Sequence, residues 1–380
     1  FDVDRFNGYV EEWPLEWPGI VSTYATTSTA ATSRLTRMGL DDPLRSVIEE
    51  EILRDAPLAY YTMGEAELGT KAADSSGRAA ESAVPIASAL PTFGTATGPT
   101  TDDLTAATFP SSTGPRLRAG GFSATLNGVG FWLACSGTLS SAVQILRITD
   151  PAASGAALRV NMFPGPDSIV LNFNGFADVS ATFACDGTVR HVFVQQSGAD
   201  VNLYIDGVLA ATAVATTLGA FKEVYIGPDS PGAGVDLTFA HLAVFDTAPS
   251  SARIADHALA GSTGFAGETA VTRLARYAAY AGIASADYLF SASALTPMAH
   301  IDTAGQTPLA LMQRVAETDG GVLYDGRRGL LTYKDRTVRY NATATVTLFV
   351  YSSEVEANYA PKLDRSALIN KVNAALSDDP

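Results

Sequence analysis

The chain has 380 residues, of which 47% are hydrophobic and 17% are charged, and its formal net charge at pH 7 is −15. This length and composition predict two or three globular domains. No apolar run is long enough to cross a membrane and residues 1–10 lack the pattern of a secretory signal, so membrane insertion is not expected. The acidic balance makes nucleic acid a poor partner, although an acidic surface is also common on soluble proteins.

Residues 1–55 are expected to begin with two strands and to end with a helix. Apolar residues alternate over residues 6–14, a Trp-Pro-Gly turn follows, and a second strand is expected over residues 20–26. Asp41 and Asp42 are possible helix caps, and Glu49 to Glu51 would form an acidic outer face. The apolar residues that share one helical face are Leu44, Val47, Ile48, Ile52 and Leu53. We therefore predict a surface helix.

Residues 56–262 consist of short strand-forming runs separated by Gly, Pro, Asp and Asn, a spacing typical of an all-β sandwich or barrel. Asp206-Gly207 predicts a tight hairpin, because both residues tolerate a positive φ. A short helix is expected over residues 249–259. The apolar residues that should point into a two-sheet core are Phe131, Leu133, Val192, Val194, Leu203, Ile205, Leu242 and Val244.

Residues 263–380 return to mixed structure. One helix is expected over residues 269–281, ending at Gly282, and another over residues 308–318. The runs 321–324 and 330–333 are expected to form a hairpin. The strand-like start of the chain and the lack of a turn signal near its end suggest a segment of a longer polypeptide.

Cys135 and Cys185 are the only cysteines. Each lies beside a strand-forming run, and neither has a cysteine or a histidine at metal-ligand spacing. The two thiols could form a disulfide or lie reduced in the sandwich core. We favour buried thiols, because free cysteine is among the most buried residue types.

Three stretches of the middle region, in the expected order, resemble a laminin-G-like or concanavalin A-like jelly roll. Residues 58–66, followed by Asp-Ser-Ser-Gly at 74–77, resemble the opening of the family's fold. Residues 190–209, which include Tyr-Ile-Asp-Gly at 204–207, resemble the family's paired strands. Residues 224–249 resemble its last strand and closing turn. The resemblance implies a lectin-like sandwich over residues 56–262.

The flanking segments resemble bacteriophage minor tail or baseplate-hub proteins. Gly-Tyr-Val-Glu-Glu-Trp-Pro at 8–14 is similar to the opening strand pair of the hub, and residues 307–325 are similar to its later helix-to-hairpin element. The order makes sense if a sandwich whose ends lie close together is inserted into the scaffold. The resemblance thus implies a mainly β chain: a jelly-roll sandwich at 56–262 inserted into an α+β tail-hub-like domain formed by residues 1–55 and 263–380.

The jelly-roll resemblance also implies a possible calcium site at one rim of the sandwich. Asp74 stands at the position of the family's Asp-Ser-Ser-Gly motif and could ligate a hard cation. The acidic residues that the family tends to supply on its last strand are replaced here by Ala240 and His241. We therefore favour a turn-capping role for Asp74 over calcium, and we expect no other cofactor.

No catalytic motif of a nucleophilic hydrolase, zinc protease or phosphate-binding loop is present. The four histidines are His191, His241, His257 and His300. We expect His191 to be a hydrogen-bonded, partly buried strand residue and not a base. Carboxylate pairs such as Glu11-Glu12 and Asp102-Asp103 leave a glycosidase open, because related jelly rolls include such enzymes. Trp13 and Trp17 could stack on a sugar, but we favour anchoring of the strand turn.

The resemblance of the flanks to tail proteins implies a non-enzymatic virion protein of the tail tip. It also implies that the partners are other tail proteins and further copies of the chain, in a trimer or a higher ring, and that the sandwich contacts a host glycan or a tail protein. The sequence does not identify the ligand-binding residues. One alternative is a secreted carbohydrate-active enzyme with an accessory lectin-like domain. Another is a sandwich that has lost ligand binding and serves only in packing.

Overall fold

The computed structural model describes four short strands before residue 30 and residues 42–341, apart from 87–88, 102–103, 153–155, 166, 174–178, 292–295 and 326–329. Strand β1 (Tyr9–Glu12) pairs antiparallel with β4 (Thr27–Thr29), and β2 (Leu15–Glu16) pairs with β3 (Thr23–Tyr24). The predicted strands are thus present only as shorter pieces, since β4 lies beyond the predicted end at residue 26, and the predicted turn at residues 17–19 lies outside the described residues. Trp13 and Trp17 lie outside the described residues, so their anchoring role stays a prediction.

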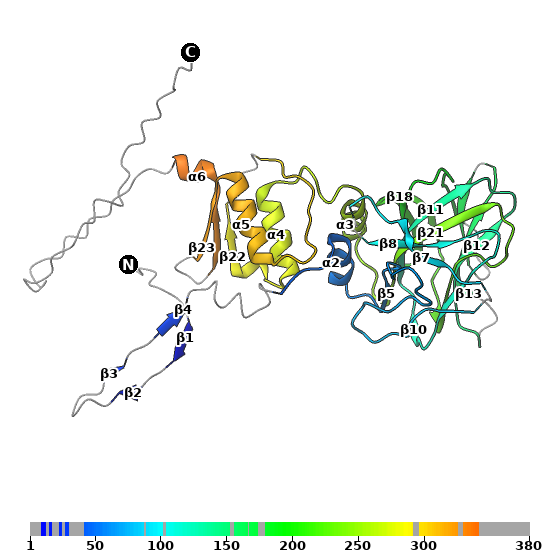
Figure 1. The fold of residues 1–380 in the computed structure, drawn as a ribbon, viewed down its shortest axis with the longest axis horizontal. Coiled ribbons are helices and arrows are strands. Elements are labelled where there is room, and N and C mark those ends of the chain that lie inside the picture. The colour runs from blue at the N-terminus through cyan, green and yellow to red at the C-terminus, as the bar shows by residue number, and fades with distance from the viewer. Residues whose placement is uncertain are drawn as a thin grey trace, which may run out of the picture. The chain divides into compact units, whose positions relative to one another are not determined.

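The middle of the chain folds into two antiparallel sheets, shown in Figure 1. The strands of the first sheet are β5 (Ala59–Tyr61), β7 (Thr92–Thr97), β8 (Thr105–Phe109), β11 (Gly128–Gly137), β16 (Arg190–Ser197), β17 (Asp200–Ile205), β18 (Val208–Ala213) and β21 (Val235–Phe245). The order of this eight-stranded sheet is β18-β17-β16-β11-β21-β8-β7, and β5 also pairs with β21.

The second sheet has seven strands. They are β6 (Val84–Pro85), β9 (Leu117–Ala119), β12 (Val143–Thr149), β13 (Ala156–Phe163), β14 (Ser168–Asn172), β15 (Val179–Thr182) and β20 (Glu223–Ile226). Their order is β15-β14-β13-β12-β20-β9-β6, and β10 (Ala124–Thr125) forms a separate pair with β19 (Ala220–Phe221). The predicted mainly β, jelly-roll-like sandwich is confirmed.

The core lies between the two sheets, as the alternation of apolar residues predicts. Seven of the eight predicted core residues are buried there, and Ile205 is partly buried against them. The predicted hairpin joins β17 to β18, with Asp206 at φ 50° and Gly207 at φ 78°. The Asp206 side chain also accepts a 2.9 Å hydrogen bond from the backbone N–H of His191.

The flanking segments supply helices and a small sheet. The helices are α2 (Val47–Arg54), α3 (Ser251–Ser262), α4 (Ala270–Tyr280), η2 (Ser285–Asp287), α5 (Pro308–Asp319) and α6 (Arg336–Asn341). Strands β23 (Val322–Asp325) and β24 (Leu331–Lys334) form the predicted hairpin, and β22 (Tyr288–Phe290) adds to it in parallel. Gly282 has a φ of +70° just beyond α4, as its predicted capping position requires. Among the described residues no helix is long and apolar enough to span a membrane.

Helix α2 differs from the predicted surface helix in two respects. Its cap is not Asp41 or Asp42 but Ser46, which forms a capping box with Glu49. Glu51 is not part of an exposed acidic face, since it is fully buried. Arginines from α3 and α4 meet the Glu51 carboxylate, an arrangement that the helical periodicity of residues 44–53 cannot reveal.

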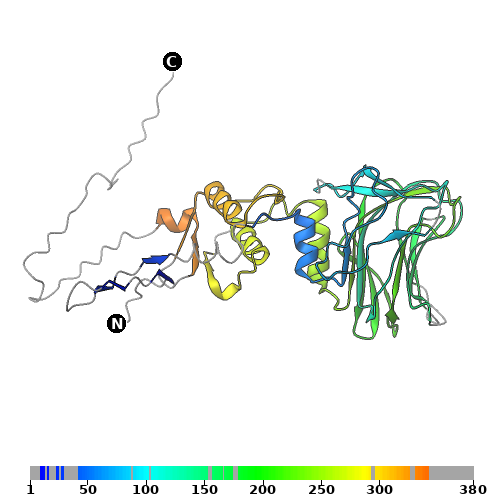
Figure 2. The ribbon, with the colours of Figure 1, turned by 60° about the horizontal axis from the view of Figure 1, so that its bottom comes forward.

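The two ends of the sandwich lie next to each other. The first strand β5 pairs with the last strand β21, with Ala59 opposite Val244. Helices α2 and α3, which precede and follow the sandwich in sequence, lie side by side and share a core with its outer residues (Figure 2). This geometry is what an inserted domain requires. The boundaries at 55 and 262 themselves stay predictions.

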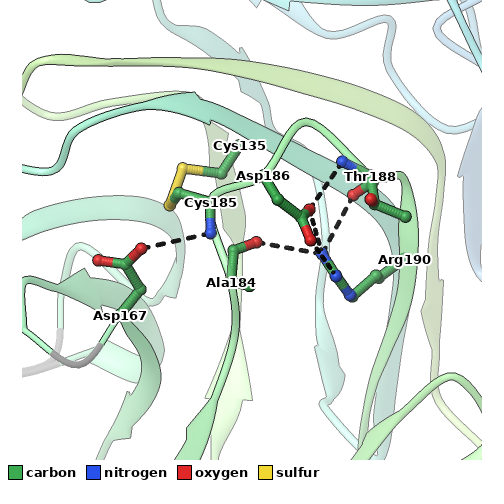
Figure 3. Close-up of a disulfide and its surroundings, with 7 residues drawn as sticks. All are labelled: Cys135, Asp167, Ala184, Cys185, Asp186, Thr188 and Arg190. Carbon is green, nitrogen blue, oxygen red and sulfur yellow. Dashed lines mark hydrogen bonds and ion pairs between the residues drawn. A yellow bond between two sulfur atoms is a disulfide. The ribbon is translucent and has the colours of Figure 1, made fainter.

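Cys135 and Cys185 form a disulfide, so the prediction of two free thiols was wrong (Figure 3). Cys135 lies on β11 and Cys185 just before β16, the neighbouring strand. Their Cα atoms are 4.5 Å apart, a separation that suits a disulfide. The Gly187 N–H donates to the Cys135 carbonyl at 2.8 Å, which shows how the register brings these segments together. The register was the missing information, because residues fifty positions apart have no local signal of contact.

Candidate functional site

Asp74 holds a loop of the sandwich in place. Its Oδ1 atom accepts hydrogen bonds from the N–H groups of Tyr60 (2.9 Å) and Ser76 (3.1 Å), and Oδ2 accepts from Ser76 Oγ and from Ala80 N. Both carboxylate oxygens are thus engaged, in keeping with the favoured capping role. The part of the chain that the structure describes contains no group of three acidic, histidine or cysteine side chains suited to a metal. Calcium at Asp74 stays a prediction from the sequence.

Three of the four histidines are buried between the sandwich and helices α2 and α3. His241 contacts the Tyr60 hydroxyl at 2.6 Å, and His257 Nε2 lies 2.7 Å from Asp55. His191 is fully buried, not partly buried as predicted, and its Nδ1 atom has no hydrogen-bond partner among the described residues. Burial and the nearby His257 hold the pKa of His191 well below its usual value. His300 is exposed, and it lines a hollow of about 580 Å³ with Thr and Ser side chains.

The outer face of the seven-stranded sheet carries a row of polar side chains. In an antiparallel sheet, residues that are register partners on neighbouring strands present their side chains side by side on one face. Arg118 is opposite Tyr225, Tyr225 is opposite Arg147, Arg147 is opposite Arg159, and Arg159 is opposite Asn172. These five residues come from five adjacent strands. We call them the arginine–tyrosine row.

The row points away from the core because the residues on either side of each member are buried. Leu146 and Ile148 flank Arg147, and Leu158 and Val160 flank Arg159, with all four apolar side chains in the core between the sheets. Arg159 itself is exposed, and Arg147 and Tyr225 are half-buried. Because the row lies on paired strands within the sheet, the backbone holds the Cα positions of these residues in place.

Tyr225 is the centre of the row. The guanidinium of Arg116 lies 5.0 Å from the centre of the Tyr225 ring, and that of Arg147 lies 5.7 Å from it, both within the range of cation–π attraction. The Tyr225 hydroxyl donates to Glu223 at 2.6 Å, and Arg118 forms an ion pair with the same carboxylate. The ring is thus held in place by charged neighbours on two sides.

The electrostatics of the row follow from these contacts. Burial acts to raise the pKa of Glu223. Hydrogen bonds from Tyr225 and Arg118 act to lower it and outweigh the burial, so the net shift of this pKa is downward. The pKa of Tyr225 is raised, first by its bond to Glu223 and then by burial. Burial lowers the pKa of Arg116, against the attraction of Asp229. Glu223 is therefore a fixed anion and not a proton donor near neutral pH.

Amide side chains continue the polar surface beside the row. Gln144 is opposite Asn161 on the next strand, and the Asn161 amide donates to the Asn172 side chain. These residues are half-buried, so each presents part of its amide to solvent. Amides and guanidiniums on a rigid sheet can hydrogen-bond several hydroxyl or carboxyl groups of one ligand.

Sequence reasoning did not find this row. A local signal existed, since Arg118, Arg147 and Arg159 are each flanked by apolar residues, which is the pattern of a strand with one exposed face. What the sequence did not reveal is that the three strands are near neighbours. Strand order and register together place residues 118, 225, 147, 159 and 172 in one line.

No family model matches the sequence, and no curated protein matches it. Among solved structures, the botulinum neurotoxin serotype C1 binding domain is similar at 10% identity and a TM-score of 0.42, over 57% of this chain and 55% of that chain. The botulinum neurotoxin serotype D ligand binding domain in complex with N-acetylneuraminic acid is similar at 15% identity and a TM-score of 0.43, over 57% and 53%. The match spans about half the length of these structures.

Proposed function

We propose that the chain is a non-catalytic component of a bacteriophage tail tip, and that its sandwich binds a glycan of the host surface through the arginine–tyrosine row. The observation that carries the glycan part is the row itself, with its neighbouring amides on the uncovered face of a rigid sheet. Sugars present many hydroxyl groups in fixed directions, and planar amide and guanidinium groups can bond them in pairs. Because the strands hold these groups in place, little ordering is required on binding.

The tail-tip part of the proposal rests on the resemblance of the flanking segments to minor tail and baseplate-hub proteins. In this proposal the flanks assemble around the tail axis with other tail proteins and further copies of the chain, and the sandwich is displayed outward. Electron microscopy of the purified protein tests this part. A closed ring of three or more copies is expected, and a monomer at micromolar concentration would contradict it.

Glycan binding is tested by measuring the affinity of the chain for a panel of bacterial surface polysaccharides. Replacing both Asn172 of the row and its neighbour Asn161 by alanine removes a hydrogen-bonded amide pair, and we expect binding to weaken by about 2 kcal/mol, a roughly thirtyfold rise in Kd. Asn202→Ala is the matched control, because Asn202 is also a half-buried strand amide but lies on β17 of the other sheet. Equal effects of the two changes, or no binding to any polysaccharide, would contradict the proposal.

The enzymatic alternative predicts turnover instead of binding alone. Glu223 is the carboxylate held within the row, and its lowered pKa is unsuited to protonating a leaving group. We expect no release of reducing ends from any polysaccharide that the chain binds. Turnover that is abolished by Glu223→Gln would favour the enzyme.

A further inference from the structure

We infer that the glycan bound by this face is anionic, and that Arg116, Arg147 and Arg159 together form a site for the carboxylate or phosphate groups that it carries. This inference rests on the proposed function, since it names the chemical class of the ligand for the same face. It depends on three observations about these arginines: their placement, their missing partners and the charge of the surrounding protein.

Arg147 and Arg159 are directly opposite each other on neighbouring antiparallel strands. Like charges in this position repel and destabilise the sheet. Neither arginine forms an ion pair with any carboxylate among the described residues. A bound anion between the two guanidiniums would remove the repulsion.

Arg116 and Arg147 also carry donors that lack acceptors. The Nε and Nη2 atoms of Arg116 and the Nε atom of Arg147 are shielded from water and have no hydrogen-bond partner in the described part of the chain. A shielded donor without a partner is unfavourable, and a charged one more so. Both guanidiniums lie against Tyr225, so an oxyanion held beside that ring could accept from both after small side-chain rotations.

The nearby carboxylates attract two of these arginines, since Asp229 acts on Arg116 and Glu223 on Arg147, but neither carboxylate forms an ion pair with them among the described residues. Glu223 is bound by Arg118 and Tyr225, and Asp229 accepts from the backbone N–H of Gln144 at 3.2 Å. The other arginines of the two sheets and their loops, Arg78, Arg118 and Arg190, each form an ion pair. Among the described residues, the arginines of the two sheets and their loops that form no ion pair are therefore Arg116, Arg147 and Arg159.

The overall charge makes this grouping more specific. The chain has 40 acidic against 25 basic side chains, so carboxylates are abundant for pairing. A general attraction to polyanions is not expected from a protein with a net charge of −15. Three guanidiniums that form no ion pair, on a face that no other described element covers, instead favour a local site that matches the fork geometry of carboxylate or phosphate.

The test compares polysaccharides that differ only in charge. Polygalacturonate and alginate are each presented in native form and after reduction of their carboxyl groups to alcohols, together with poly(glycerol phosphate) and poly-L-glutamate. We expect at least about tenfold tighter binding to a native polymer than to its reduced form, with an affinity that falls as salt is raised. Tighter binding to poly(glycerol phosphate) than to either uronate would identify phosphate as the preferred anion.

Variants assign the effect to the row. Arg147→Gln combined with Arg159→Gln should abolish the preference for the native polymer, whereas Arg314→Gln, an exposed arginine on α5, should leave it intact. Thermal unfolding of each variant checks that the fold is kept. Equal binding of native and reduced polymers would overturn the anion inference and leave glycan binding standing, whereas binding to none of the polysaccharides would overturn both. Equal binding to poly-L-glutamate would show charge attraction without sugar recognition and would also overturn the inference.

Discussion

The two sheets of the sandwich share one core but differ on their outer faces. The eight-stranded sheet presents Trp132, Phe193, Tyr204 and Phe245 outward, and all four are buried; the last three share a core with helices α2 and α3. The seven-stranded sheet presents arginines, a tyrosine and amides on its outer face. An outer face that is covered needs apolar side chains, and one that is free can carry polar groups for a ligand. The comparison separates the face that packs against the helices from the face that we propose binds the ligand.

The helices beside the covered face hold a buried ionic cluster, and the largest expected effect comes from it. Glu51 is fully buried and meets Arg253 of α3 and Arg276 of α4, while Tyr280 donates to it at 2.8 Å. We expect Glu51→Ala to lower the free energy of unfolding by an amount at the lower end of about 3–5 kcal/mol. The two guanidiniums lose the carboxylate that they share, while Arg253 keeps Asp55 and Arg276 keeps Glu268. Denaturant unfolding measures this. The control Glu317→Ala changes an exposed position on α5 and should change the free energy of unfolding little. An equally small change for Glu51→Ala would show that the cluster does not stabilise the fold.

The disulfide constrains the part of the chain that carries most of the arginine–tyrosine row. Cys135 and Cys185 are separated by 50 positions, and strands β12 to β15 lie between them. We expect replacement of both cysteines by serine to lower stability by about 2–4 kcal/mol, chiefly by freeing the unfolded chain. Mass measurement after alkylation, with and without reductant, checks that the bond forms. Free thiols in the native protein under oxidising conditions would refute this pairing.

Acid should destabilise the protein through the buried carboxylates beside the covered face. Burial acts to raise the pKa values of Glu51 and Asp55, but Arg253 together with Arg276 or His257 outweighs it and lowers both. A lowered folded pKa gives stability that is present above the unfolded values of 4.5 and 3.8 and is lost as the pH falls through the folded values. Urea unfolding from about pH 7 to pH 3 should show this decline, with a shallower slope in Asp55→Asn. An identical slope in that variant would exclude Asp55 as a source of the effect.

The smallest expected change has the opposite sign. Arg159→Gln removes one of two like charges that face each other on the free sheet, so stability should rise by about 0.2–1 kcal/mol while affinity for an anionic polymer falls. Thermal unfolding and binding measured on the same preparation test both halves. A loss of stability would mean that Arg159 has a structural role on the sheet.

Much of the fold could be predicted from local patterns. The helices at 269–281 and 308–318 and the hairpin turn at Asp206-Gly207 follow from periodicity, caps and a turn signal, each carried by a few adjacent residues. The disulfide and the burial of Glu51 could not be predicted in this way. Both depend on contacts between residues that are 50 or more positions apart, and their local sequence is equally compatible with a free thiol or a solvated carboxylate.

The sequence by itself determined that the middle of the chain forms antiparallel strands with one apolar face. Apolar residues at every second position lie on one face only if the backbone is extended, because successive side chains of a strand point to opposite faces. Only the tertiary structure decided which strands are neighbours, and so which of the outward residues act together. Arg118, Tyr225, Arg147, Arg159 and Asn172 are scattered over more than one hundred positions, and strand order and register bring them into one row. The physical reason is that hydrophobic burial specifies which face of a strand points inward, whereas the ligand-binding surface depends on which strands pair.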